Sequence, residues 1–155
     1  MLEIKELRKA YGKFHALNGL TMTVGEGALY GFVGPNGAGK TTAIKIMTGL
    51  LEADSGQVLI DGRDVTDFEG GLKPQIGYVP DFFGVYDNLT VGEYMEFFAS
   101  CYPMDGLLAR KRCLALLEQV GLDERTDFSV YGLSRGMKQR LCLARASIHD
   151  LRLLF

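Results

Sequence analysis

Cysteine is scarce in this sequence, and charge of neither sign is in clear excess. The three cysteines, Cys101, Cys113 and Cys142, lie far apart in apolar helical patterns, without a CxxC or Cys/His spacing suited to zinc. We therefore expect buried, reduced thiols in a cytosolic protein. Lys and Arg number 17 and Asp and Glu 19, with no basic run. This balance argues against nucleic acid or an anionic membrane surface as a partner.

Long hydrophobic runs are also lacking. The N-terminus, residues 1–13, alternates charged and apolar residues, so no signal peptide is predicted. The longest apolar stretches fall far short of the ~20 residues of a membrane helix. With 155 residues, 47% of them apolar and 23% charged, the chain fits one globular domain. A role at a membrane would be played from the aqueous side, through a partner.

Apolar patterns predict strands in the first half of the chain and helices in the second. The run Ala28–Val33 is nearly continuously apolar, which is typical of a strand buried on both faces. Thr90 and Glu93 form a capping-box pattern at a helix start. Strands are predicted at 2–7, 18–24, 28–33, 57–60 and 76–79, and helices at 40–51, 91–101, 107–120 and 136–148. This order suits an α/β core with a helical insertion.

A glycine-rich loop carries the clearest chemical signal. It reads Gly34-Pro35-Asn36-Gly37-Ala38-Gly39-Lys40-Thr41, matches GxxxxGK[ST], and lies between a predicted strand and a predicted helix. Its glycines let backbone N–H groups approach an anion, and the following helix adds its free N–H groups and positive dipole end. We predict a nucleoside triphosphate site. Lys40 would reach the β- and γ-phosphates, Thr41 would ligate Mg²⁺, and Thr42 would donate to a phosphate oxygen.

A second motif identifies the kind of P-loop protein. The segment Leu133-Ser134-Arg135-Gly136-Met137, followed by KQRLCLARA, resembles the LSGGQ signature of ABC ATPases. Arg135 replaces the first signature Gly and Met137 replaces the Gln. Ser134 and Gly136 are retained, and a hydroxyl with the N–H groups of a helix start makes a second anion site. The resemblance covers most of the chain and is strongest to ATP-binding subunits of bacterial ABC-2-type exporters.

The resemblance implies a fold and a set of ligands. The fold is an α/β P-loop NTPase (ABC ATPase) core with an antiparallel β subdomain and a helical insertion, incomplete at the C-terminus. The core would span about 1–83, the helical subdomain about 84–139, and the signature helix with the start of a Walker B strand 140–155. The implied ligands are ATP and Mg²⁺. Tyr11 matches the aromatic residue that stacks on adenine, although it could also be a loop aromatic that covers the core edge.

The resemblance also implies partners and a location. The partners would be a second ATP-binding domain, identical or different, and a transmembrane permease subunit. The chain would be cytoplasmic, and the permease would hold it at the cytoplasmic face of the membrane. The expected function is an ATP-binding subunit that couples ATP binding and hydrolysis to transport. The alternative is a non-hydrolysing nucleotide-binding fragment of a frameshifted or degenerate gene. A small GTPase or kinase is disfavoured, because those enzymes lack the Ser134–Arg145 pattern and no NKxD motif is present.

Two departures from the family pattern affect catalysis. Asp81 stands at the Q-loop position, where the family has Gln. Its carboxylate could serve Mg²⁺, or it could be a solvated loop residue after Pro80. The Walker B Asp and Glu would fall just past Phe155, so we assign no catalytic residue and expect negligible hydrolysis by these residues alone. Asp61 is no substitute, because Asp61-Gly62 reads as a hairpin turn. Without the Walker B strand beside Ala28–Val33, we expect marginal stability.

Overall fold

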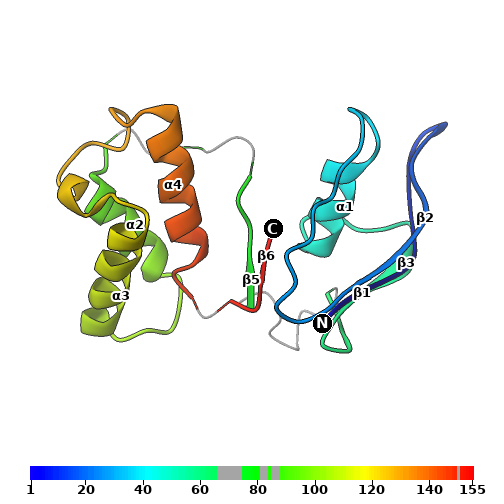
Figure 1. Ribbon diagram of the computed structural model, residues 1–155, viewed down its shortest axis with the longest axis horizontal. Coiled ribbons are helices and arrows are strands. Elements are labelled where there is room, and N and C mark those ends of the chain that lie inside the picture. Colours follow the sequence, from blue (N-terminus) through cyan, green and yellow to red (C-terminus); the bar gives the residue numbers. More distant parts are fainter. Residues whose placement is uncertain (66–74, 81–83, 85–87, 150) are drawn as a thin grey trace. The chain divides into compact units, whose positions relative to one another are not determined.

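The computed structural model describes residues 1–65, 75–80, 84, 88–149 and 151–155. The chain divides into two compact units, an N-terminal unit (Met1–Lys73) and a C-terminal unit (Pro74–Phe155). Over these described residues, the N-terminal unit holds a four-stranded sheet and one helix, and the C-terminal unit holds three α-helices and a short two-stranded sheet (Figure 1). Within the described ranges, no helix has the length and apolar character of a membrane span. The mixed α/β architecture matches the predicted fold class.

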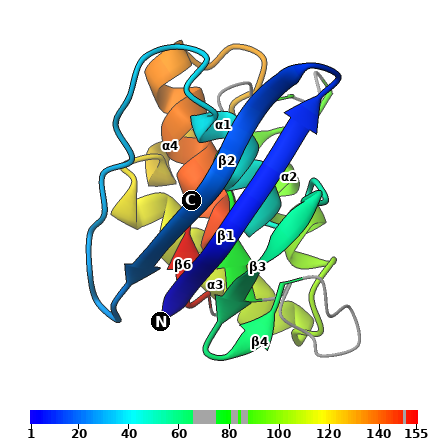
Figure 2. The same cartoon turned by 90° about the vertical axis from the view of Figure 1, so that its right-hand side faces the viewer.

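The sheet of the N-terminal unit is antiparallel throughout. Its strands in spatial order are β2 (Phe14–Val24), β1 (Leu2–Tyr11), β3 (Ser55–Ile60) and β4 (Arg63–Asp64). Helix α1 (Lys40–Met47) lies against one face of this sheet (Figure 2) and buries Ala43, Ile46 and Met47. Every strand and helix predicted in this unit is present except 28–33, and β1 and β2 are longer than predicted because they meet in one hairpin.

Strand β1 contains a bulge that the alternation of its residues requires. Ile4 and Leu7 are both buried although three positions separate them. Glu6 has a φ of 47°, and the register with both neighbouring strands shifts there. One extra residue returns Leu7 to the buried face. Gly56 on β3 lies so close that a Cβ on it would stand 2.5 Å from the Glu6 carbonyl oxygen.

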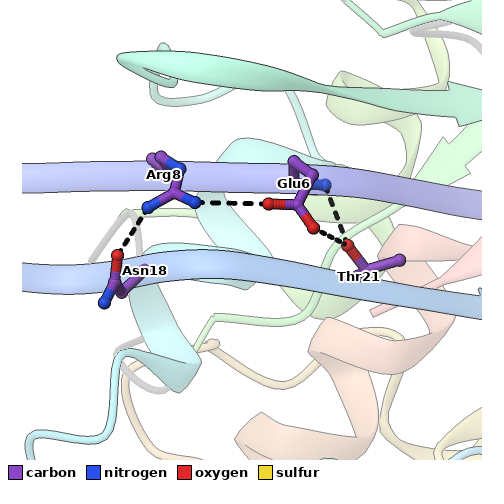
Figure 3. Close-up of polar contacts among 4 residues, drawn as sticks. All are labelled: Glu6, Arg8, Asn18 and Thr21. Carbon is purple, nitrogen blue, oxygen red and sulfur yellow. Dashed lines mark hydrogen bonds and ion pairs between the residues drawn. The ribbon is translucent and has the colours of Figure 1, made fainter.

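A polar network spans the exposed side of this bulge (Figure 3). Thr21 on β2 accepts a hydrogen bond from the Glu6 N–H at 3.0 Å and donates to the Glu6 carboxylate at 3.2 Å. Arg8 donates to Glu6 at 3.2 Å and to Asn18 at 2.6 Å. Side chains therefore connect β1 and β2 where the bulge interrupts their register.

The predicted strand at Ala28–Val33 is not formed. The segment belongs to no strand, and Leu29 and Val33 are almost fully exposed. Within the N-terminal unit, the sheet β2-β1-β3-β4 does not include it. The prediction of a strand buried on both faces is therefore wrong for this structure. An apolar run becomes a buried strand only through neighbouring strands and covering helices, which its own composition cannot supply.

The Asp61-Gly62 turn is confirmed. Both residues have positive φ, 48° and 79°, and they join β3 to β4. The Asp61 carboxylate pairs with the N-terminal ammonium of Met1. A hairpin turn therefore accounts for Asp61, as its sequence context predicts.

In the C-terminal unit, helix α2 (Val91–Ala99) begins with the predicted capping box. The Thr90 hydroxyl accepts from the Glu93 N–H at 3.2 Å, and the Glu93 carboxylate accepts from the Thr90 N–H at 2.8 Å. This backbone bond, with a second from the Thr90 hydroxyl, holds the pKa of Glu93 below its ordinary value. The local signal was therefore sufficient to place this helix start.

Two more helices complete the bundle, α3 (Gly106–Gln119) and α4 (Arg135–Ala146), with a 3₁₀ turn, η2 (Asp123–Arg125), between them. Hydrophobic residues form their core, and the most buried of these are Val91, Tyr94, Met95, Leu117, Leu122, Val130, Leu141 and Ile148. Cys113 and Cys142 are buried as predicted, but Cys101 is exposed. Cys101 lies in the turn after α2, where the helix no longer presents a face to the core.

Helices α3 and α4 cap each other. Arg140 of α4 donates to the carbonyl oxygens of Val120 and Gly121, at 2.6 and 3.3 Å, just after α3 ends. Arg112 of α3 donates to the carbonyl oxygens of Ser147 and Ile148, at 3.1 and 3.4 Å, just after α4 ends. Cations at helix C-termini satisfy free carbonyls and oppose the negative dipole end. The pair therefore fixes the relative position of the two helices.

We expect Arg140→Met to lower the free energy of unfolding by about 1–2 kcal/mol, because two charge-assisted hydrogen bonds and a favourable dipole interaction are lost. Arg and Met have similar helix propensity, so the change isolates the cap. The control is Arg110→Met, which removes an exposed ion pair with Glu96 at 3.6 Å and should cost less than about 0.5 kcal/mol. Urea unfolding followed by circular dichroism measures both, and equal losses would refute the capping role.

The small sheet of the C-terminal unit is parallel. Strand β5 (Ile76–Gly77) pairs with β6 (Leu153–Leu154), and further bonds join Gln75 to Arg152 and Val79 to Phe155. His149 is buried between α4 and this sheet, with Nε2 3.2 Å from the Ile76 carbonyl oxygen and its ring stacked on Tyr102. The predicted strand at 76–79 is thus present in shortened form.

Candidate functional site

The P-loop, Gly34–Thr42, forms a turn that leads directly into α1. Gly37 and Gly39 both adopt left-handed backbone conformations, with φ of 84° and 81°. The Ala38 N–H donates to the Pro35 carbonyl at 3.2 Å, and Gly39 is the N-cap of α1. The loop therefore has a defined conformation, which its glycines make accessible.

The two glycines are required for different reasons. A Cβ on Gly39 would lie 2.2 Å from the Ala16 carbonyl oxygen and 2.9 Å from Leu17 Cδ2, because β2 passes directly against the start of α1. A Cβ on Gly37 would meet nothing within 4 Å. Glycine is therefore favoured at position 37 only by its backbone angle. At position 39, glycine also allows the P-loop to pack on β2.

The start of α1 presents free backbone donors. The first intrahelical bond runs from the Ala43 N–H to the Gly39 carbonyl at 2.8 Å, so the N–H groups of residues 40–42 precede it. The first turn of α1 carries no acidic side chain. Free N–H groups and the positive dipole end of the helix thus coincide at one place, as an anion site requires.

Lys40 folds back across its own loop. Its ammonium donates to the carbonyl oxygens of Gly34 and Pro35 at 2.6 and 2.7 Å. This places a full positive charge over the same loop whose N–H groups follow at the helix start. Asn36 and Ala38 contribute backbone between these points and are exposed, as is Thr41 in the first turn of α1. The P-loop residues singled out from the sequence therefore lie together.

Tyr11 lies at the end of the β1–β2 hairpin, opposite Phe14 across a tight turn. Its side chain is 52% exposed. Ala16, whose carbonyl abuts Gly39, follows shortly after Phe14 on β2. The structure therefore places Tyr11 on the hairpin that also contacts the P-loop, with an aromatic face open to solvent.

The signature segment, Leu133–Met137, forms the start of α4. Ser134 is the N-cap, and its hydroxyl oxygen accepts from the Met137 N–H at 3.3 Å. Its hydroxyl hydrogen remains available to donate. Leu133 is buried and Met137 packs against the helical core, whereas Ser134, Arg135 and Gly136 are exposed. A Cβ on Gly136 would meet nothing within 4 Å, so the segment is anchored by its ends and open between them.

Asp81 lies outside the described residues, and its two readings both stay open. Among the residues that are described, no group of three or more His, Cys, Asp or Glu side chains could hold a metal ion. The Thr41 hydroxyl, in the first turn of α1, is a hard oxygen donor, which is the donor type that Mg²⁺ prefers. The described part of the site therefore fits Mg²⁺ bound together with phosphates.

Two features of the site could not be found by motif. One is the contact of Gly39 with Ala16 and Leu17, and the other is the set of hydrogen bonds from the end of β1 to Asp54. Both join residues that are distant in sequence. The local pattern Asp54-Ser55-Gly56 is typical of a turn and indicates nothing more. Such contacts depend on how α1 packs on the sheet, and no local pattern reports that.

Comparison with known proteins agrees with this geometry. Residues 17–155 match the sequence profile of the family described as ABC transporter. This chain belongs to that family. The chain is 37% identical over its full length to the probable multidrug ABC transporter ATP-binding protein YbhF of Escherichia coli K12, of which it covers 27%. It is 36% identical over 99% of its length to the linearmycin resistance ATP-binding protein LnrL of Bacillus subtilis, of which it covers 50%.

Solved structures show the same ABC cassette fold. The dimeric bacterial ABC transporter cassette MJ0796 superposes with a TM-score of 0.87 at 28% identity, covering 99% of this chain and 72% of that one. The same cassette is also known as a dimer bound to ADP and Pi. The resemblance to ABC ATP-binding proteins and the predicted fold class are therefore confirmed. The chain spans between a quarter and a half of the length of the curated relatives named above.

Proposed function

We propose that this chain is the nucleotide-binding part of an ABC transporter ATP-binding subunit, of the exporter type. The observation that carries the proposal is the P-loop at the start of α1. There, free N–H groups, a helix dipole and the Lys40 ammonium lie together on a loop whose Gly39 is fixed against β2. A triphosphate is the ligand with enough negative charge and acceptor oxygens to engage all of them.

Each site residue then has a role. The N–H groups along the P-loop cradle the β-phosphate, and Lys40 with Thr42 donates to phosphate oxygens. Mg²⁺, held by Thr41, would neutralise charge on the β- and γ-phosphates. Tyr11 stacks on adenine, since base–aromatic stacking needs only an exposed aromatic face. Asp81 is a second candidate for Mg²⁺.

We further propose that the active form pairs two ATP-binding domains. Ser134 and Gly136 of one copy would donate to the γ-phosphate held by the P-loop of the other. The exposed, N-capping position of Ser134 supports this role, and a related cassette is dimeric. Closure of the pair would drive a permease subunit, with this chain at the cytoplasmic face. The relatives' names suggest a drug or antibiotic-like cargo.

Isothermal titration with MgATP, MgADP and AMP tests the nucleotide assignment on this chain. We expect ATP and ADP to bind and AMP to bind undetectably, because AMP lacks the phosphates that the P-loop engages. Phosphate release from ATP should be negligible, because no residue here is assigned as a Walker B carboxylate. The proposal would be refuted if the chain is shown to be folded by its circular dichroism spectrum and still does not bind ATP. Substantial phosphate release would refute only the expectation that this chain hydrolyses ATP negligibly.

A further inference from the structure

Asp54 makes three hydrogen bonds to residues near the C-terminal end of β1, just before the β1–β2 turn. Its carboxylate accepts from the Lys9 ammonium at 2.8 Å and from the Ala10 N–H at 2.7 Å. Its own N–H donates to the Arg8 carbonyl at 3.0 Å. The Lys9 side chain is only 16% exposed. The bonded residues directly precede Tyr11, so Asp54 holds the backbone that carries this aromatic side chain.

These bonds replace a strand partner that β1 lacks at this point. The pairing of β1 with β3 ends at Arg8 and Ser55. Beyond that pair, the Ala10 N–H would face solvent without a partner from the sheet, and the Asp54 carboxylate satisfies it. The hydrogen bonds from Lys9 and Ala10 keep the pKa of Asp54 below its ordinary value. The contact therefore persists as a charge-assisted one at neutral pH.

The opposite side of β1 is held as well. Arg8 reaches across the hairpin to Asn18 on β2 at 2.6 Å (Figure 3). The end of β1 is thus held on the β2 side by the bond between Arg8 and Asn18. On its other side it is held by Asp54, in the loop before β3. Tyr11 pairs with Phe14 at the end of this hairpin, so the position of its ring depends on how firmly the neighbouring residues of β1 are held.

The loop that carries Asp54 continues from the helix that begins at the P-loop. Helix α1 ends at Met47, and the N–H groups of Leu50 and Leu51 both return to the Lys45 carbonyl, at 2.8 and 3.1 Å. The chain then reaches Asp54, which immediately precedes β3. Asp54 therefore links the C-terminal end of α1 to the strand end that carries Tyr11.

From this arrangement we propose that Asp54 is a positioning residue for base recognition, which sets the place of the Tyr11 ring relative to the phosphate site at the start of α1. The proposal rests on the nucleotide-binding function given above and adds a residue to it. It implies that Asp54 affects the affinity for the base part of a nucleotide and leaves the affinity for its phosphates unchanged.

The test compares MgATP with magnesium tripolyphosphate, which has the phosphates and no base, by isothermal titration on the full chain. We expect Tyr11→Ala to weaken ATP binding about tenfold, the size of one base–aromatic contact. Asp54→Ala should weaken ATP binding by about threefold to tenfold on the same basis. Neither change should alter tripolyphosphate binding. In the double variant the two effects should not add, because Asp54 acts through Tyr11.

Two further variants separate positioning from folding. Asp54→Asn keeps an acceptor for the Ala10 N–H and should recover most of the ATP affinity. Thr21→Val removes hydrogen bonds to Glu6 on the same hairpin and should leave the ratio of ATP to tripolyphosphate affinity unchanged. Equal loss of both ligands in Asp54→Ala, additive effects with Tyr11→Ala, or an unchanged ATP affinity in Tyr11→Ala would overturn the positioning role. Failure of both ligands to bind the wild-type chain would instead overturn the nucleotide-binding proposal.

Discussion

Gly39→Ala is expected to abolish measurable ATP binding and to lower the free energy of unfolding by about 2–5 kcal/mol. Two costs combine at this position. An alanine at a φ of 81° costs about 1–2 kcal/mol. The added Cβ would also stand 2.2 Å from the Ala16 carbonyl oxygen, so α1 would have to move away from β2. Because the P-loop N–H groups belong to the start of α1, that movement disturbs the phosphate site directly.

Gly37→Ala is the matched control for stability. Its φ of 84° is nearly the same, yet a Cβ there meets nothing within 4 Å. Only the backbone cost of about 1–2 kcal/mol should remain. Urea unfolding of both variants, with titration of ATP into each, gives the comparison. Equal destabilisation by the two substitutions would show that the packing of Gly39 on β2 is not what holds the P-loop.

Lys40→Met is expected to weaken ATP and tripolyphosphate binding by about a hundredfold or more. Two charge-assisted hydrogen bonds at roughly 1.5 kcal/mol each amount to that factor. The free energy of unfolding should change by less than about 1 kcal/mol, because the Gly34 and Pro35 carbonyls that Lys40 now contacts are exposed and can bind water instead. Loss of binding without loss of stability distinguishes Lys40 from Gly39.

The same chemical change at the other end of α1 provides the control. Lys45 is exposed in the last turn of the helix, and Lys45→Met alters the net charge equally. It should weaken both affinities far less than Lys40→Met does, because Lys45 lies further along the helix and salt screens the attraction between exposed charges that are not in contact. Similar losses in the two variants would mean that overall charge, and not contact by Lys40, governs phosphate binding.

Local chemistry was the part of the fold that the sequence revealed well. The capping box of Thr90 and Glu93, the Asp61-Gly62 turn and the P-loop with its following helix are all set by residues a few positions apart, and all are present in the structure. Each rests on backbone angles or hydrogen bonds that are satisfied within one turn. Such signals do not depend on how the rest of the chain packs.

The errors concern residues whose environment is supplied from elsewhere. The sequence predicts a buried strand at Ala28–Val33 and a buried thiol at Cys101, yet the segment is in no strand and is mostly exposed, and Cys101 is exposed. Their apolar character was read correctly, but burial depends on neighbours that composition does not reveal. The contact of Gly39 with Ala16 and the bonds of Asp54 to β1 were missed for the same reason. The roles of individual site residues remain predictions that the variants above address.

The reciprocal capping of α3 and α4 by Arg140 and Arg112 has a mechanical consequence. The C-terminal end of each helix, α3 and α4, is hydrogen-bonded by an arginine of the other, and both helices contribute residues to one buried core. We therefore expect a force applied at Ser134 to move α3 and α4 together as one rigid body, and not to bend α4 alone. If Ser134 contacts a ligand as proposed, movement of that ligand should therefore displace α3 together with α4.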